Sequence, residues 1–169
     1  TAFPERMALS YYNVINSLSL NPYILDVNYN SINKLANFGE FTLNNKNTIE
    51  GTVAFVDMGA TSINVSIFKD GKIDFTRMIK IGGANIDFAL SESMNMSIKS
   101  TEFIKMKEVD LLDNDEGNIK TKTIQKVVDE VLEELERIIQ FYRNKSNSSI
   151  DKLYVFGGLS RFKNMDIYL

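Results

Sequence analysis

Residues 51–68 constrain this chain most, because they place a carboxylate, a glycine and two hydroxyl residues in a short turn between two apolar strands. Asp57 ends the first strand, and a buried carboxylate is costly unless a metal-bound phosphate or amide donors compensate it. Gly59 gives the backbone freedom that a close ligand needs. The hydroxyls of Thr61 and Ser62 could then meet phosphate oxygens. The alternative is an ordinary β-hairpin in which Asp-x-Gly only makes the turn.

The composition limits the classes of protein to which the chain can belong. Its 169 residues are 44% hydrophobic and 24% charged, which is typical of one or two small folded domains. The net charge of −3 argues against general nucleic-acid binding. The sequence contains no Cys and no His, which excludes disulfides, a Ser-His-Asp hydrolase and a His-based metal centre. No apolar run reaches membrane-spanning length, so we expect a cytoplasmic protein.

The N-terminal segment predicts two helices, a short strand and a polar loop. Pro4 suits the first turn of an amphipathic helix. Residues 23–27 predict a short strand, and Asn28 is expected to cap a second helix that ends at Gly39. Residues 43–48 are polar and low in complexity, so we place a domain boundary there.

The middle of the chain predicts an antiparallel meander. Apolar runs cover residues 52–57, 63–68 and 73–81, and Asp70-Gly71 is a strong signal for a two-residue hairpin turn. The pair Gly82-Gly83 closes the meander and precedes a helix.

Two further features complete this part of the chain before the long helix. Its methionines, Met94, Met96 and Met106, are expected to fill irregular packing under a small cap. The acidic run at 110–117 lacks the ligand pattern of a calcium loop and predicts a solvated loop.

The last third of the chain predicts a long helix and a second glycine turn. Apolar residues from Thr121 onward define one helical face, and acidic residues form a solvated face opposite. Residues 152–156 predict a buried strand, followed by Gly157-Gly158 and another helix. Each glycine pair could be a simple connector. Strand, glycine and helix units nevertheless favour a mixed sheet flanked by helices, with Asp57 and the second pair converging on one pocket.

Several of these segments resemble the actin, hexokinase and Hsp70 superfamily of ATPases. Residues 56–62 resemble its second phosphate motif, and residues 155–160 resemble its adenosine motif. Within that superfamily, residues 68–85 and 141–166 are most similar to the PilM family of type IV pilus assembly proteins. Residues 11–27 are similar to the end of the extra subdomain that this family shares with the division protein FtsA.

The resemblance implies an α/β fold: an actin-like (ribonuclease H-like) ATPase lobe with a mixed sheet flanked by helices. The lobe would span residues 49–169, with its core at 49–84 and 121–169 and a small inserted subdomain at 85–120. Residues 1–48 would be a remnant of the extra subdomain and a connecting helix. The chain would thus correspond to the carboxy-terminal half of family members.

The resemblance also implies a site for ATP or ADP with Mg²⁺. By matching position, Asp57 would hold Mg²⁺ through water, and the residues after it would line the β- and γ-phosphates. Leu159 stands where the family has a small residue and could crowd the base, and no residue is assigned a catalytic role. The full set of nucleotide-binding residues would be Asp57, Gly59, Ala60, Thr61, Ser62, Gly82, Gly83, Gly157, Gly158 and Leu159.

The function implied is that of a cytoplasmic, nucleotide-binding component of the type IV pilus machinery. It would bind the tail of a PilN-like inner-membrane protein, communicate with the pilus assembly ATPase and self-associate. At most weak ATPase activity is expected of the full-length protein, and none of this segment alone. The alternatives are a nucleotide-free pseudo-ATPase scaffold, an FtsA-like division protein and a sugar kinase-type phosphotransferase.

Overall fold

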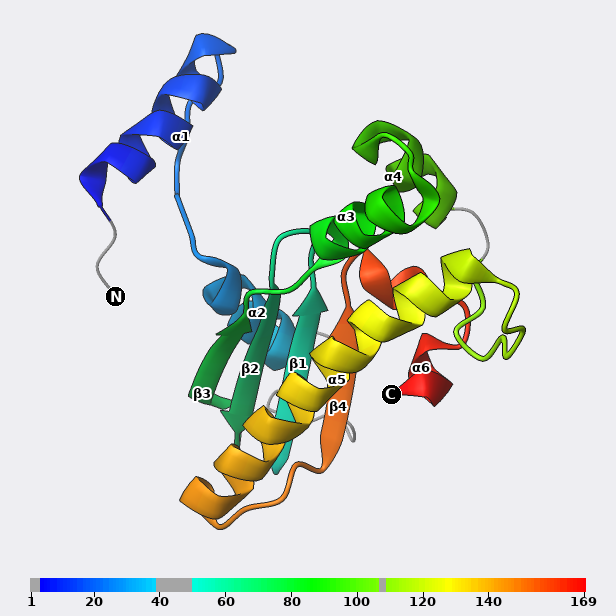
Figure 1. Cartoon of the computed structure of the whole chain (residues 1–169). Coiled ribbons are helices and arrows are strands. Elements are labelled where there is room, and N and C mark those ends of the chain that lie inside the picture. The colour runs from blue at the N-terminus through cyan, green and yellow to red at the C-terminus, as the bar shows by residue number, and fades with distance from the viewer. Residues whose placement is uncertain (1–3, 39–49, 107–108) are drawn as a thin grey trace.

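A computed structural model of the chain describes residues 4–38, 50–106 and 109–169. Its four strands form one mixed sheet in the order β3-β2-β1-β4 (Figure 1). β1 pairs antiparallel with β2, β2 antiparallel with β3, and β4 lies parallel to β1. The predicted meander is therefore confirmed, and the strands are β1 (Thr52–Met58), β2 (Ile63–Lys69), β3 (Lys72–Ile79) and β4 (Lys152–Phe156).

The turn between β2 and β3 has the predicted geometry. Asp70 and Gly71 have φ angles of 49° and 75°, so both lie in the left-handed region that a primed two-residue turn requires. Lys69 and Lys72 face each other across the turn. The register of the hairpin is thereby fixed.

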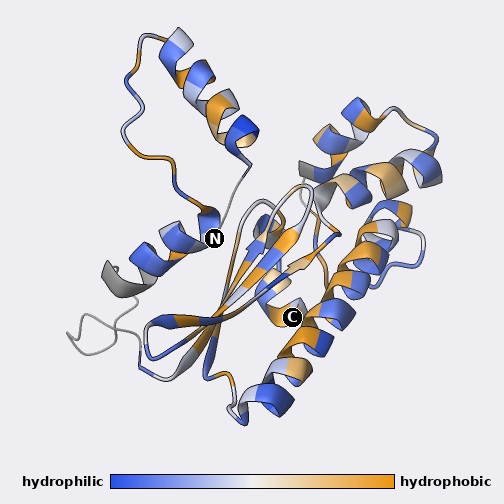
Figure 2. Ribbon diagram, turned by 90° about the vertical axis from the view of Figure 1, so that its left-hand side faces the viewer, coloured by the Kyte–Doolittle hydropathy of each residue, from blue (hydrophilic) through white to orange (hydrophobic). Residues whose placement is uncertain are grey.

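Helices cover both faces of the sheet. α5 lies along one face and α2 lies on the other, as the two perpendicular views show (Figures 1 and 2). α3 and α4 stand beyond the end of the sheet to which β1 and β4 point (Figure 1). The helices are α1 (Glu5–Ser17), α2 (Asn28–Phe38), α3 (Gly83–Met94), α4 (Ile98–Met106), α5 (Ile119–Ser146), the 3₁₀ turn η1 (Leu159–Arg161) and α6 (Met165–Tyr168).

Alternation along the strands divides the core into two apolar clusters. On the α5 side, Val56 of β1 and Val65 of β2 join Leu90 of α3 and Ile124 of α5 in the larger cluster. On the α2 side, Ile32, Val53, Phe55 and Phe68 form the smaller one. Because both faces of β1 are covered, its sequence is a nearly continuous apolar run.

The segment before α2 differs from the prediction. Residues 23–27 form no strand, and Tyr23 is 93% exposed. A lone strand has no partner for its backbone groups, and no described strand pairs with this segment. Asp26 instead accepts hydrogen bonds from Val27 N and Asn30 Nδ2 and pairs with Lys34 at the start of α2.

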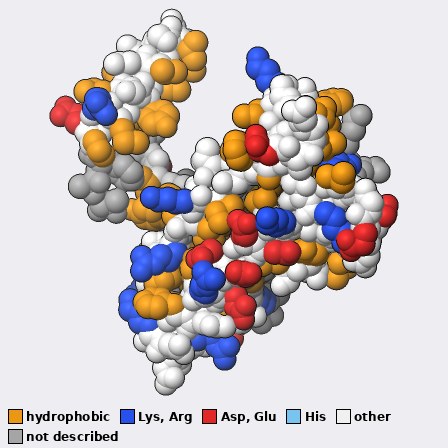
Figure 3. Space-filling view, viewed as in Figure 1, with side chains coloured by type: hydrophobic (Ala, Val, Ile, Leu, Met, Phe, Trp, Pro, Cys, Tyr) orange, Lys and Arg blue, Asp and Glu red, His pale blue; other side chains and the backbone are white. Residues whose placement is uncertain are grey.

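α1 is the most exposed of the described helices. It has the predicted amphipathic pattern, yet none of its residues is buried. Met7, Tyr11 and Val14 are among its exposed apolar side chains, which Figure 3 shows along the helix. Gly39 and the boundary predicted at 43–48 lie outside the described residues.

Two predictions about burial need correction. The acidic run is not simply a solvated loop, because Leu111 is fully buried in the main core and anchors it. β4 is not a buried strand, since it lies at the edge of the sheet and leaves Leu153 37% exposed. Among the described helices, none is both long and apolar enough to cross a membrane.

Candidate functional site

The parallel pairing of β1 and β4 brings two predicted turns together. Asp57 faces Phe156 in the register, so the segments that follow both strands begin at the same end of the sheet. A Cβ atom placed on Gly157 would lie 2.6 Å from Met58 O and 2.9 Å from Asp57 Oδ1, and Gly157 has a φ of 99°. Only glycine fits there, and Asp57 and Gly157 are neighbours at this end of the sheet.

The turn after β1 is held by the start of α3. Gly83 N donates to Gly59 O at 3.1 Å, and Ala84 N donates to Ala60 O at 2.7 Å. A Cβ atom on Gly82 would lie 2.6 Å from Ala60 O, so this close approach requires a glycine. Two of the first amides of the helix are thus satisfied by the turn itself.

The same turn keeps its own amides available. Within the described ranges, the backbone N–H groups of Ala60, Thr61 and Ser62 have no hydrogen-bond acceptor. Thr61 is exposed and Ser62 is half-buried. Successive unpaired amides next to hydroxyl side chains are suited to an anion.

A pocket of about 430 Å³ lies where these segments meet α4 and η1. Of the residues predicted from the sequence, the structure places Gly59, Ala60, Gly83, Gly158 and Leu159 in its wall. Glycine contributes no side chain, so much of this wall is accessible backbone. Asp57, Thr61, Ser62, Gly82 and Gly157 do not line this pocket, although they lie in or beside the turns that form it.

Asp57 does not line this pocket, and its carboxylate contacts α2. Its Oδ2 accepts a hydrogen bond from Asn28 Nδ2 at 2.9 Å, at the first residue of α2. Asn28 is the cap predicted for that helix, but its side chain instead joins α2 to the end of β1. A carboxylate has more acceptor sites than this contact uses, so Asp57 retains capacity for a hydrated cation.

Leu159 narrows the pocket. Its side chain is 6% exposed, and its Cδ2 lies 3.4 Å from the position that a Cβ atom on Gly83 would occupy. It also belongs to the main core. The residue therefore serves packing as well as the pocket wall.

The polar residues that α4 contributes are not among the site residues predicted from the sequence. Glu102 and Lys105 both line the pocket, and their spacing of three residues places them on one face of α4. That spacing was readable in the sequence, but nothing in it indicated that this face turns toward Gly83 and Gly158. Arg161 and Lys163 add two more cations to the pocket wall.

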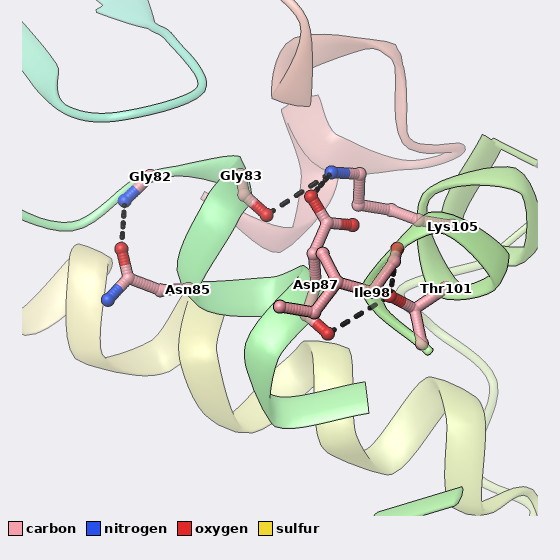
Figure 4. A network of polar contacts seen from close by, with 7 residues as sticks. All are labelled: Gly82, Gly83, Asn85, Asp87, Ile98, Thr101 and Lys105. Atoms are coloured by element: carbon pink, nitrogen blue, oxygen red, sulfur yellow. Dashed lines mark hydrogen bonds and ion pairs between the residues drawn. The ribbon is translucent and has the colours of Figure 1, made fainter. Parts of the chain in front are cut away.

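Lys105 is tied to α3 by a small polar network, drawn in Figure 4. Its Nζ donates to Gly83 O at 3.2 Å and to Asp87 Oδ2 at 2.5 Å. Thr101 Oγ1 donates to Asp87 O at 3.1 Å. The network joins α4 to the glycine pair that closes the meander.

Lys163 is paired with the acidic run. Its Nζ lies 2.9 Å from Asp110 Oδ2, and Leu112 N and Asn164 Nδ2 donate to the same carboxylate. The hydrogen bond from Lys163, followed by those from Leu112 and Asn164, lowers the pKa of Asp110 from 3.8 to about 2. Asp110 is therefore ionised at neutral pH and holds Lys163 beside the pocket.

The site thus combines accessible backbone, unpaired amides and cations at one end of the sheet. Such a wall can hold a phosphorylated ligand by positioning and charge, since glycine turns allow close approach and Lys and Arg offset negative charge. The carboxylate of Glu102 offers an acceptor for hydroxyl groups. This arrangement fits a nucleotide.

Solved structures with the same fold support this interpretation of the architecture. A PilM-PilN type IV pilus biogenesis complex matches with a TM-score of 0.68 at 22% identity, over 91% of this chain and 41% of that one. The ethanolamine utilization protein EutJ from Carboxydothermus hydrogenoformans matches with a TM-score of 0.67 at 17% identity, over 99% of this chain and 53% of that one.

An ADP-bound structure belongs to the same set. MreB5 of Spiroplasma citri matches with a TM-score of 0.59 at 17% identity, over 99% of this chain and 58% of that one. The chain thus spans between two fifths and three fifths of these structures. At these identities the likeness shows the actin-like fold, which confirms the predicted fold class.

The family itself is shown by sequence. No curated protein sequence matches the chain. A family model described as type IV pilus assembly protein PilM matches residues 8–169, which is nearly the whole chain. The chain belongs to the PilM family of type IV pilus assembly proteins.

Proposed function

We propose that the full-length protein is a cytoplasmic, nucleotide-binding component of the type IV pilus assembly machinery. One observation carries the nucleotide part: the pocket at the ends of β1 and β4 is walled by Gly59, Gly83 and Gly158 and flanked by Lys105. The amides of the β1–β2 turn would receive phosphate oxygens, and Leu159 would border the base. Mg²⁺ would supply the charge that offsets the phosphates, with Asp57 holding it through water.

The proposed partner is the cytoplasmic tail of a PilN-like inner-membrane protein. Support comes from family membership and from the likeness to a chain solved in a PilM-PilN complex. Through that tail and the pilus assembly ATPase, the protein would act at the inner face of the cell membrane in pilus assembly and twitching motility. The division of the chain at residues 49, 85 and 121 remains part of this proposal.

Isothermal titration with ADP tests the nucleotide part. The full-length protein should bind ADP more tightly with Mg²⁺ than with EDTA, because the cation offsets charge that the protein alone does not. Asp57→Asn should lose most of that Mg²⁺ dependence. Asp166→Asn, at an exposed carboxylate on α6, should keep it.

A nucleotide-free scaffold is the second candidate, and Leu159 favours it. The buried side chain occupies part of the wall that a base would need. If isothermal titration of the full-length protein shows no binding heat with Mg-ADP or Mg-ATP at millimolar concentrations, the result supports a nucleotide-free scaffold. Binding that is indifferent to Mg²⁺ in the wild type would contradict the role proposed for Asp57.

A further inference from the structure

Lys105 lines the pocket, and its ammonium group is bound by two residues of α3. Its ammonium has three N–H donors, and the contacts with Gly83 O and Asp87 Oδ2 account for two. The side chains of Lys105 and Asp87 are only 14% and 13% exposed. Because Lys105 also lines the pocket, its third N–H is left for a group bound there.

The buried carboxylate of Asp87 contributes little to the free energy of unfolding. Its Oδ1 is buried and has no hydrogen-bond partner among the described residues. A buried ion pair with an unsatisfied oxygen contributes little to folding, and apolar residues of similar volume often replace such pairs without loss. The pair therefore calls for an explanation other than stability.

Asp87 also bears on the pairing of Lys105 with Glu102. Glu102 precedes Lys105 by three residues on α4, a spacing at which oppositely charged side chains usually meet. Both residues are described, yet the structure shows no ion pair between them. Because Lys105 is drawn toward Asp87, as Figure 4 shows, the carboxylate of Glu102 stays free to accept hydrogen bonds in the pocket.

We propose that Asp87 is a positioning residue that fixes the ammonium of Lys105 at the pocket wall, so that its remaining N–H meets bound nucleotide while Glu102 stays unpaired. A lysine head on its flexible stem would otherwise move into solvent or pair with Glu102. Fixing it in advance removes an ordering cost from binding. This inference rests on the proposed nucleotide function.

A double-mutant cycle on the full-length protein tests the inference, with the affinity for Mg-ADP as the measurement. Asp87→Asn should weaken binding about tenfold, the scale of one charge-assisted hydrogen bond, and Lys105→Met should weaken it by a similar factor. The double variant should be no weaker than Lys105→Met alone, because Asp87 acts only through Lys105. Glu92→Gln on α3 and Lys99→Met on α4 are exposed control variants and should bind as the wild type does.

A purely structural role gives a different result. In that case Asp87→Asn would lower the melting temperature but leave the affinity unchanged, or the two losses of affinity would multiply in the double variant. Either result overturns the positioning role while leaving nucleotide binding intact. No binding by the wild type would overturn the proposed function and this inference together.

One further variant covers the chance that Asp87→Asn does not fold. Asp87→Glu keeps the charge pair but displaces the ammonium by about one methylene length, roughly 1.5 Å. It should keep the wild-type melting temperature and still weaken binding severalfold. Wild-type affinity in Asp87→Glu would contradict the inference.

Discussion

Gly157 shows how one residue can fix the geometry of the site. Its φ of 99° lies in the left-handed region, and a Cβ atom there would clash with Met58 O and Asp57 Oδ1. The next residue, Gly158, has a φ of −62° and open space around its Cβ position. The backbone therefore requires glycine at position 157 but not at position 158.

Gly157→Ala should destabilise the full-length protein by about 1–3 kcal/mol, because the methyl group adds a clash to a strained backbone conformation. Gly158→Ala is the matched control and should change the free energy of unfolding by less than about 0.5 kcal/mol. Urea denaturation measures both. Equal effects at the two positions would mean that the turn after β4 differs from the one described.

The lowered pKa of Asp110 makes the stability of the folded protein depend on pH in the acidic range. Its pKa is lowered to about 2 in the folded protein, so its contribution is fully present above its ordinary value of 3.8. That contribution is lost as the pH falls from near 4 toward 2, because protonation removes the charge that Lys163 and Leu112 N bind. Asp110→Asn should therefore be less stable than the wild type at pH 5 and similar to it at pH 2.

Denaturant midpoints measured between pH 5 and pH 2 test this. Asp166→Asn removes an exposed carboxylate and serves as the control. A difference between wild type and Asp110→Asn that stays constant over the range would show that these contacts do not lower the pKa of Asp110.

At the scale of elements, α5 organises the lobe. One face of this helix buries Ile124, Val128 and Leu135 against the sheet and α3, and the other carries the acidic residues that Figure 3 shows over its middle. Its start is capped by Asn118, whose Oδ1 accepts from Thr121 N at 3.1 Å. The cap also joins the helix to the acidic run, since Asn118 Nδ2 donates to Asp113 Oδ2.

Asn118→Ala should lower the free energy of unfolding by about 1 kcal/mol, the usual value of a helix cap. Asn118→Ser keeps a capping oxygen and should recover most of that loss. Thermal or urea unfolding of the full-length protein measures both variants. A serine variant as unstable as the alanine one would place the loss in the contact with Asp113 instead of the cap.

The elements that carry their own local signals were predictable from sequence. The hairpin at Asp70-Gly71, the face of α5 and the strand before Gly157 each follow from turn chemistry or periodicity. The strand expected at 23–27 was wrong because a strand depends on a partner, which lies elsewhere in a sequence. The contribution of Glu102 and Lys105 was missed for the same reason, because the approach of α4 to Gly83 is a tertiary contact.

At the scale of the whole molecule, this chain carries the wall of the pocket in which we propose that nucleotide binds. The pocket is built from the turns after β1 and β4 together with α3, α4 and η1. Phosphoryl transfer depends on positioning and charge around the phosphates, and no residue of this wall is assigned to orient an attacking water. We therefore expect the 169-residue chain alone to show no ATP turnover above background in a steady-state phosphate-release assay. Turnover that Asp57→Ala abolishes would contradict this expectation.

Binding of the proposed PilN-like partner is also tested on the whole molecule. A peptide with the sequence of the cytoplasmic tail of the matching PilN-like protein should bind the full-length protein in a fluorescence anisotropy titration. A peptide of the same composition in scrambled order should not bind. Equal binding of both peptides would contradict a specific tail site.

The most direct measurement is a crystal structure of the full-length protein grown with Mg²⁺ and a non-hydrolysable ATP analogue. We predict density for the nucleotide against Gly59, Gly83 and Gly158, with Lys105 still held by Asp87 and in contact with the ligand. Nucleotide bound at a different surface, or none at saturating concentration, would contradict it.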